Sequence, residues 1–325
     1  MQARLEEARR EHDELTFTGG EPTLDEDLAA HIAAAKALGF RRIGLQTNGR
    51  LLARSGHVES LARAGLTDVH FSIHGAEAAV HDYHTGAPGS FAEALAALSS
   101  VRAEGLAVAV TTVVTRSNFR VLATLPRLLA SRGVAAWLLA VPRVAGRARA
   151  VFDRVVPRLG LAMPFALHAL AVAETLGLPA WIQGAPACLL GPFAARALYD
   201  EARAYGGACD ACEAKPSCPG ADADYLARFG GDELTPCKPI APADAHASLR
   251  AMFLGVGEMA AHAKAASKGE SGGVTTSSKR VALPMLGKVK PALAEVSAGS
   301  ERKTGEALRE IFPALFDAAP KKSGD

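Results

Sequence analysis

The chain has 325 residues, of which 49% are hydrophobic and 22% charged, a balance typical of a globular protein with a substantial core. Lys and Arg number 36 and Asp and Glu 34, so nothing in this balance points to nucleic acid or an acidic membrane, and we expect neither as a partner. The N-terminal stretch is charged and helix-like, without the apolar core of a signal peptide, and no run of about 18 apolar residues predicts a membrane span. We therefore expect a cytoplasmic protein.

Short apolar segments rich in β-forming residues alternate with helical patterns along the first half of the chain. Apolar residues recur every three or four positions at 28–35, at 91–98 behind a Ser90/Glu93 capping box, and at 122–129 after Asn118. The predicted strands are residues 15–18, 42–47, 68–73, 108–114 and 136–141. Each strand is followed by enough chain for a crossover helix, so the sheet should be parallel. The sequence predicts an α/β fold, either a β/α barrel or a doubly wound sheet.

Polar, glycine-bearing segments follow these strands: "TGGEP", "QTNG", "SIHG", "VVTRSN" and "VPRVAGR". The carboxyl ends of parallel strands meet at one rim, where barrel enzymes place their sites. Any one of these segments is explained by turn formation alone, but five together favour a binding rim. In "GGEP", two glycines let a ligand approach the backbone, Glu21 can accept hydrogen bonds from a ligand ammonium, and Pro22 stiffens the turn.

Residues 15–150 resemble the radical SAM superfamily, in which a GGEP-type motif after the second barrel strand holds the amino group of S-adenosylmethionine. The resemblance continues through "LQTNGRLL", "FSIHGAEAAVHDYHTGAPGSFAEAL", "VTTVVTRSN" and "VPRVAGRA". It implies a partial (β/α)6 barrel and a cofactor site formed by Gly19, Gly20, Glu21, Pro22, Thr47, Asn48 and Ser72. The glycines and Glu21 would hold the methionine end, and the other rim groups the carboxylate or ribose. His74 is an alternative group for facing the substrate, whereas His70, His81 and His84 are interpreted as core or surface histidines.

Five cysteines, an odd number, all lie between Cys188 and Cys237, which favours metal ligation over a disulfide framework. "CDACEAKPSC" supplies Cys209, Cys212 and Cys218 at C-x2-C-x5-C spacing, suited to zinc or to an iron-sulfur cluster. This spacing resembles the twitch and SPASM regions of radical SAM enzymes, which hold auxiliary 4Fe-4S clusters. The fuller SPASM pattern has a cysteine where this chain has Asp222, so we expect one cluster, with Cys188 or Cys237 as fourth ligand and zinc as the alternative.

No cysteine precedes Cys188, whereas the family binds its S-adenosylmethionine cluster through a C-x3-C-x2-C loop after the first barrel strand. Only 14 residues precede the 15–18 strand, too few for that strand, loop and crossover helix. We therefore expect a barrel without its first strand, an open edge on the 15–18 strand that promotes self-association, and no S-adenosylmethionine cleavage by this chain.

The rest of the sequence suggests appended segments. The expected divisions are a partial barrel at 1–185, an auxiliary cluster region at 186–240, a helical extension at 241–261, a flexible linker at 262–282, and a tail with a short amphipathic helix at 283–325. Two functions remain open. One is a radical SAM enzyme, or its larger part, that abstracts hydrogen from a substrate such as a peptide and needs an electron donor. The other is an inactive zinc or iron-sulfur binding module.

Overall fold

The computed structural model describes residues 1–198, 204–239, 246–250, 252–253 and 280–285. Its centre is one eight-stranded sheet in the order β7-β6-β5-β4-β3-β2-β1-β8, and every pairing is parallel. The strands are β1 (Glu14–Gly19), β2 (Arg42–Thr47), β3 (Asp68–Ser72), β4 (Ala107–Val113), β5 (Ala136–Ala140), β6 (Ala180–Gln183), β7 (Ala197–Leu198) and β8 (Arg280–Met285). Within the described residues β7 and β8 are not paired, so the sheet is a partial β/α barrel.

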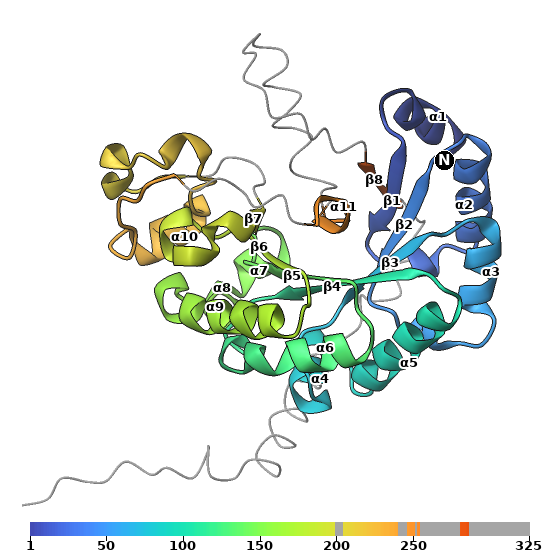
Figure 1. Cartoon of the computed structure of the whole chain (residues 1–325), viewed down its shortest axis with the longest axis horizontal. Coiled ribbons are helices and arrows are strands. Elements are labelled where there is room, and N and C mark those ends of the chain that lie inside the picture. Colours follow the sequence, from blue (N-terminus) through green and yellow to red (C-terminus); the bar gives the residue numbers. More distant parts are fainter. Residues whose placement is uncertain (199–203, 240–245, 251, 254–279, 286–325) are drawn as a thin grey trace, which may run out of the picture. The chain divides into compact units, whose positions relative to one another are not determined.

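Helices cover the outer face of the curled sheet (Figure 1). They are α1 (Gln2–Glu11), α2 (Leu28–Ala37), α3 (His57–Ala64), α4 (Ala78–Thr85), α5 (Ser90–Ala103), α6 (Leu125–Ser131), α7 (Arg147–Ala150), α8 (Phe152–Val155) and α9 (Leu159–Thr175). The short α10 (Ala223–Phe229) belongs to the cysteine region, and α11 (Ala247–Arg250) lies on the inner face of the curl (Figure 1), where its Leu249 packs with Leu138 and Trp181. Alternate strand residues, such as Leu15 and Phe17 in β1, are fully buried in the core beneath the outer helices. The predicted parallel α/β partial barrel and its first five strands are confirmed.

The predicted Ser90/Glu93 capping box at the start of α5 is wrong. Gly89, with φ 85°, is the N-cap residue and no side chain of its own caps the helix. Asp82 in the middle of α4 provides the acceptor instead, because its carboxylate accepts hydrogen bonds from the backbone N–H groups of Gly89 at 2.7 Å and Phe91 at 2.8 Å. Because Asp82 already satisfies the first N–H groups of α5, a Ser90 cap is not needed.

β8 fills the edge of β1 that the sequence predicted to be open, so that prediction is wrong. The two strands pair in parallel from Glu14 opposite Arg280 to Gly19 opposite Met285. β8 was not predicted, and it crosses the expected boundary between linker and tail. The tail helix expected near 308–316 lies outside the described residues, as does most of the extension at 241–261.

One stretch, 152–175, has the length and a mean hydropathy (1.6) that would suit a membrane-crossing helix, which the sequence analysis did not single out. Part of it is buried in the protein, 44% of the apolar window. The buried residues of α9 belong to the hydrophobic core: Leu159, Ala162, Met163, Ala166, Ala169, Leu170 and Ala173. We therefore interpret α9 as a core helix.

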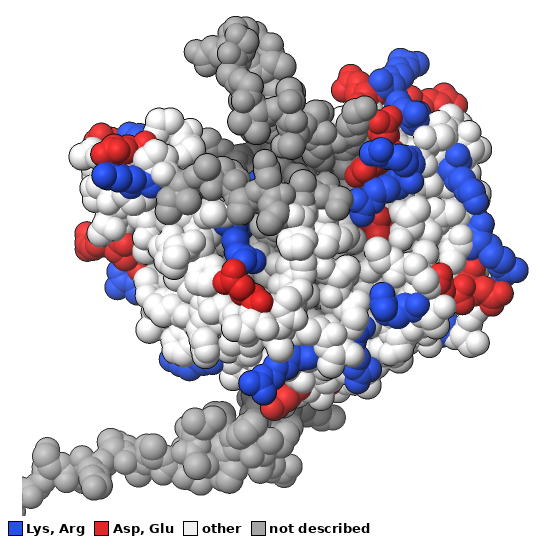
Figure 2. Space-filling model, in the orientation of Figure 1, with Lys and Arg blue, Asp and Glu red and all other residues white. Residues whose placement is uncertain are grey.

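Figure 2 shows Lys and Arg side chains interspersed with Asp and Glu over the face in view.

Candidate functional site

The two glycines of "GGEP" have different surroundings. Gly19 ends β1 with φ +136°, and a Cβ there would lie 2.9 Å from the backbone nitrogen of Met285 in β8. Gly20 is exposed, and no described atom lies within 4 Å of the position that its Cβ would take. Gly19 is thus required by the backbone contact and its left-handed φ, whereas Gly20 leaves an open approach to the main chain.

The Glu21 carboxylate joins the turn after β1 to the turn after β2. Its Oε1 accepts the Thr23 hydroxyl at 2.6 Å, the Thr23 backbone N–H at 3.1 Å and the Thr47 hydroxyl at 2.6 Å. Its Oε2 accepts the backbone N–H of Asn48 at 2.8 Å. An ionised carboxylate offers about four acceptor positions, two on each oxygen. Oε1 is therefore saturated, and Oε2 keeps capacity for a further donor such as a ligand ammonium.

The other predicted rim residues lie nearby but differ in what their side chains contact. Thr47 is only 3% exposed, and its hydroxyl donates to Glu21 and accepts the backbone N–H of Gly49. Asn48 is exposed, with its Oδ1 accepting the backbone N–H of Arg50. Ser72 ends β3, the neighbour of β2 in the sheet, and is half-buried. Thr47 thus orients Glu21, while Asn48 and Ser72 retain accessible polar groups.

Sequence reasoning missed two contributors to this rim. Thr23 supplies two of the four donors to Glu21, a role that its position directly after "GGEP" could have suggested. Gln46 accepts the Thr18 hydroxyl at 3.1 Å and so links β1 to β2 just below the turns. No sequence pattern distinguishes this Gln46 contact, because it depends on the strand register.

Three histidines form a cluster where β3 leads into α4. The His74 and His84 rings stack with centroids 3.8 Å apart, and the His81 Nδ1 accepts the His74 backbone N–H at 3.1 Å. His74 is 7% exposed, so it does not present its ring to a substrate as the alternative interpretation required. Burial, together with the neighbouring imidazoles, lowers the pKa of His74 well below 6.5 and that of His84 to about 4. The cluster is therefore neutral at pH 7 and serves packing.

All five cysteines line one small pocket of about 10 Å³: Cys188, Cys209, Cys212, Cys218 and Cys237. Backbone N–H groups point at two of the sulfurs. The Cys218 Sγ accepts hydrogen bonds from the backbone N–H groups of Ala187 and Gly220, each at 3.4 Å. The Cys212 Sγ accepts one from the backbone N–H of Cys237, also at 3.4 Å. The Cys237 N–H lowers the pKa of Cys212 and so favours a thiolate there. Thiolates that receive N–H groups suit metal binding, although the sulfurs would have to move outward to enclose a cluster.

The spacing of these sulfurs differs from that of a closed zinc shell. Four thiolates around zinc, each about 2.3 Å from the ion, lie about 3.8 Å from one another. Among the described residues, the one group of three potential ligand side chains with all donor atoms within 4.8 Å is Asp25, Asp27 and His31, and no cysteines form such a group. The distances between the cysteine sulfurs are thus longer than those in a four-thiolate zinc site.

The cysteine region is fastened to the barrel by hydrogen bonds that the sequence did not reveal. Asp222 caps α10 by accepting the Asp224 backbone N–H at 3.0 Å, and its other oxygen accepts the Val144 N–H at 3.1 Å. Tyr225 donates its hydroxyl to Glu233 and accepts the Leu159 backbone N–H at 2.7 Å. Asp222, where the fuller SPASM pattern has a cysteine, therefore has a docking role.

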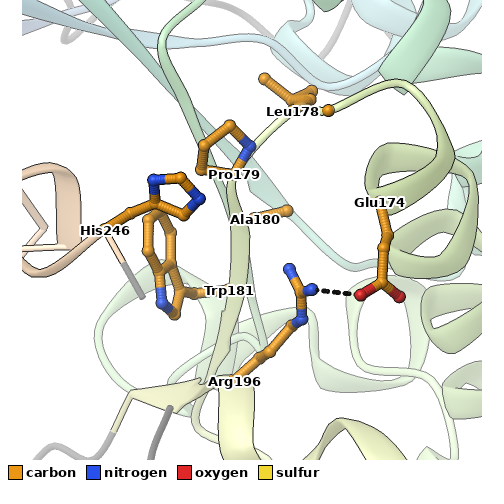
Figure 3. Close-up of a pocket in the computed structure, with 8 residues that line it drawn as sticks. Glu174, Leu178, Pro179, Ala180, Trp181, Arg196 and His246 are labelled. Carbon is orange, nitrogen blue, oxygen red and sulfur yellow. Dashed lines mark hydrogen bonds and ion pairs between the residues drawn. The ribbon is translucent and has the colours of Figure 1, made fainter. Parts of the chain in front are cut away.

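A separate hollow of about 210 Å³ lies at the amino end of β6 (Figure 3). An ion pair of 2.6 Å between Arg196 and Glu174 crosses its wall. The volume is below the roughly 300 Å³ at which small-molecule pockets begin. It also lies at the strand end opposite to "GGEP", so we assign it no part in the candidate site. Its lining includes Glu174, Leu178, Pro179, Ala180, Trp181, Arg196 and His246.

Comparison with known proteins finds similarity to the radical SAM superfamily over the first part of the chain. Residues 1–119 match the family model described as the radical SAM superfamily. The chain is 30% identical over 142 residues to the AdoMet-dependent heme synthase of Nitratidesulfovibrio vulgaris, covering 44% of this chain and 38% of that protein. It is 35% identical over 102 residues to the PqqA peptide cyclase of Methylocella silvestris, covering 31% of this chain and 27% of that protein.

Among solved structures, SuiB of Streptococcus suis bound to S-adenosylmethionine matches with a TM-score of 0.46 and 15% identity, over 56% of this chain and 43% of SuiB. The chain spans less than two fifths of the length of the two curated relatives named above.

Proposed function

We propose that the rim formed by "GGEP", "TNG" and Ser72 binds S-adenosylmethionine, and that the chain acts as a radical SAM enzyme or as its larger part. The observation that carries the proposal is the Glu21 carboxylate, which joins the first two turns and keeps Oε2 available beside the open backbone of Gly20. The family match over residues 1–119 includes both turns.

The test of cofactor binding is a Gly20→Val substitution, measured by calorimetric titration of the full chain with S-adenosylmethionine. Gly20 does not have a positive φ, so the new side chain should block the approach to the backbone while leaving the fold intact. We expect at least a tenfold loss of affinity. Gly207→Val is the matched control, because Gly207 is also exposed, open and without a positive φ. Equal affinity in Gly20→Val and the parent would reject this site.

For the cysteine pocket we propose one auxiliary 4Fe-4S cluster, supported by the five thiols that line one pocket. After anaerobic reconstitution we expect about one cluster, with the broad absorption of thiolate-bound iron, and its loss in Cys212→Ala. Zinc bound stoichiometrically, with no uptake of iron and sulfide, would reject the cluster. Single alanine variants of Cys188 and Cys237 identify the fourth ligand, because only the substitution that removes this ligand should lower the iron content.

The chemistry proposed for the whole enzyme is hydrogen abstraction from a substrate, for which a peptide is our proposed class because the PqqA peptide cyclase is among the relatives. This sequence has no cysteine before Cys188 and so offers no thiolates for the cluster that reduces S-adenosylmethionine. Given dithionite and S-adenosylmethionine, the chain should bind the cofactor without releasing 5'-deoxyadenosine, and turnover by this chain would contradict that expectation.

The alternative function is a metal-binding module on a degenerate barrel. It predicts the same metal content but no measurable affinity for S-adenosylmethionine in the parent chain. The titration described above therefore distinguishes the two functions without an activity assay.

A further inference from the structure

The outer edge of β1 is covered by a strand from the distant C-terminal part of the sequence. β8 lies at the end of the strand order and pairs with β1 alone among the described strands. Its six residues match the six residues of β1 one for one, from Arg280 to Met285. The edge of β1 would otherwise present unpaired N–H and C=O groups, which are a template for another extended chain.

β8 is held by apolar side chains as well as by its backbone. Leu283 is 7% and Met285 8% exposed, and both belong to the core on the helix-covered face of the sheet. Residues two positions apart in a strand point to the same face, so the two side chains enter the core together. The β1 edge therefore selects for an extended segment with apolar residues at alternate positions.

The end of β8 also contacts the first glycine of "GGEP". At the Gly19 position a Cβ would meet the Met285 backbone nitrogen at 2.9 Å and its oxygen at 3.0 Å. The last residue of β8 is thus paired with the first glycine of the turn that contains Glu21, with no room for a side chain between them.

We propose that the β1 edge is a strand-acceptor site for an extended peptide, and that Arg280–Met285 is its intramolecular ligand. The recognised chemistry is a parallel strand with apolar side chains two positions apart, and its seating holds the "GGEP" turn in place. The site depends on the sheet and core alone, so it stands whether or not the rim binds S-adenosylmethionine.

The experiment displaces β8 in the full chain with Leu283→Asp, which would bury an unpaired charge in the core. The matched control is Leu176→Asp, because Leu176 is 42% exposed. Three properties are measured: amide hydrogen exchange of residues 14–19, oligomeric state by light scattering, and binding of a labelled peptide, KRVALPMLG, that corresponds to residues 279–287. The control peptide carries Asp at the positions of Leu283 and Met285.

In Leu283→Asp we expect faster exchange in β1, self-association, and peptide affinity at least tenfold higher than in the parent, whose site is filled. Added peptide should restore slow exchange and the monomer, and the control peptide should not. If Leu283→Asp does not fold, Leu283→Ala should still exchange faster in β1 than Leu176→Ala. Unchanged β1 exchange in the folded Leu283 variant, or affinity for both peptides alike, would overturn the proposal.

Discussion

Replacing Glu21 with Gln removes the charge from the group that joins the turns after β1 and β2. In the parent, Oε1 accepts three hydrogen bonds and Oε2 one. If the Gln oxygen takes the Oε1 position, its NH₂ group faces the Asn48 N–H, so that bond is lost and the other three weaken. A hydrogen bond to a charged group contributes about 1.5–3 kcal/mol, and we expect Glu21→Gln to lower the free energy of unfolding by about that amount.

Urea unfolding of Glu21→Gln, compared with Glu26→Gln, measures this loss. Glu26 is exposed, and the same change there should alter the free energy of unfolding by less than about 0.5 kcal/mol. If the two variants unfold at the same urea concentration, the bonds to Glu21 do not stabilise the fold and the reasoning is refuted.

Cofactor affinity separates a direct contact of Glu21 from its role in holding the turns. If Oε2 accepts the cofactor ammonium, Glu21→Gln should weaken S-adenosylmethionine binding by about 1.5–3 kcal/mol, roughly 10-fold to 160-fold. Thr47→Val removes one donor to the opposite oxygen and should reduce stability with a smaller effect on affinity. Equal affinity in Glu21→Gln and the parent would remove Glu21 from the cofactor site.

Two further predictions concern the histidine cluster and the docking of the cysteine region. Burial lowers the pKa of His84 from 6.5 to about 4, so as the pH falls the His84 imidazole is protonated in the unfolded chain before it is protonated in the folded protein. The contribution of His84 to the free energy of unfolding is therefore complete above pH 6.5 and should be lost as the pH falls towards 4. His84→Phe should flatten the fall of Tm across that window, and a parallel Tm profile would contradict the assignment. Tyr225→Phe leaves the buried N–H of Leu159 without its acceptor and should cost about 1–3 kcal/mol in urea unfolding, whereas no loss would mean that water replaces the hydroxyl.

The strands that the sequence predicted are those whose β-forming residues are continuous and bounded by turns. β6 was missed because it has only four residues and lies close behind the long apolar helix α9, and β7 has only two residues. β8 was missed because it borders a Gly-, Ser- and Lys-rich stretch, and because its pairing partner lies near the opposite end of the sequence. Local patterns carry no information on such a partner.

For the candidate site, sequence reasoning predicted which segments meet but not how their side chains point. Parallel strands bring Glu21 and Thr47 to the same rim, as expected, yet Thr47 donates to Glu21 and is almost fully buried. Likewise, cysteine spacing predicted a shared pocket, whereas the docking of Asp222 to the backbone N–H of Val144 joins residues that are far apart in sequence.

The pairing of β1 with β8 has a consequence for how the protein is made. Glu14 and its partner Arg280 are 266 positions apart (280 minus 14), so a ribosome that adds about 5–20 residues per second needs roughly 13 to 53 seconds between them. During that interval β1 and its helices can fold, but the strand that closes their edge has not been synthesised. Until β8 is synthesised, β1 lacks the strand that pairs with it in the folded protein, so chaperones that shield strand edges should matter more during synthesis than for the finished molecule.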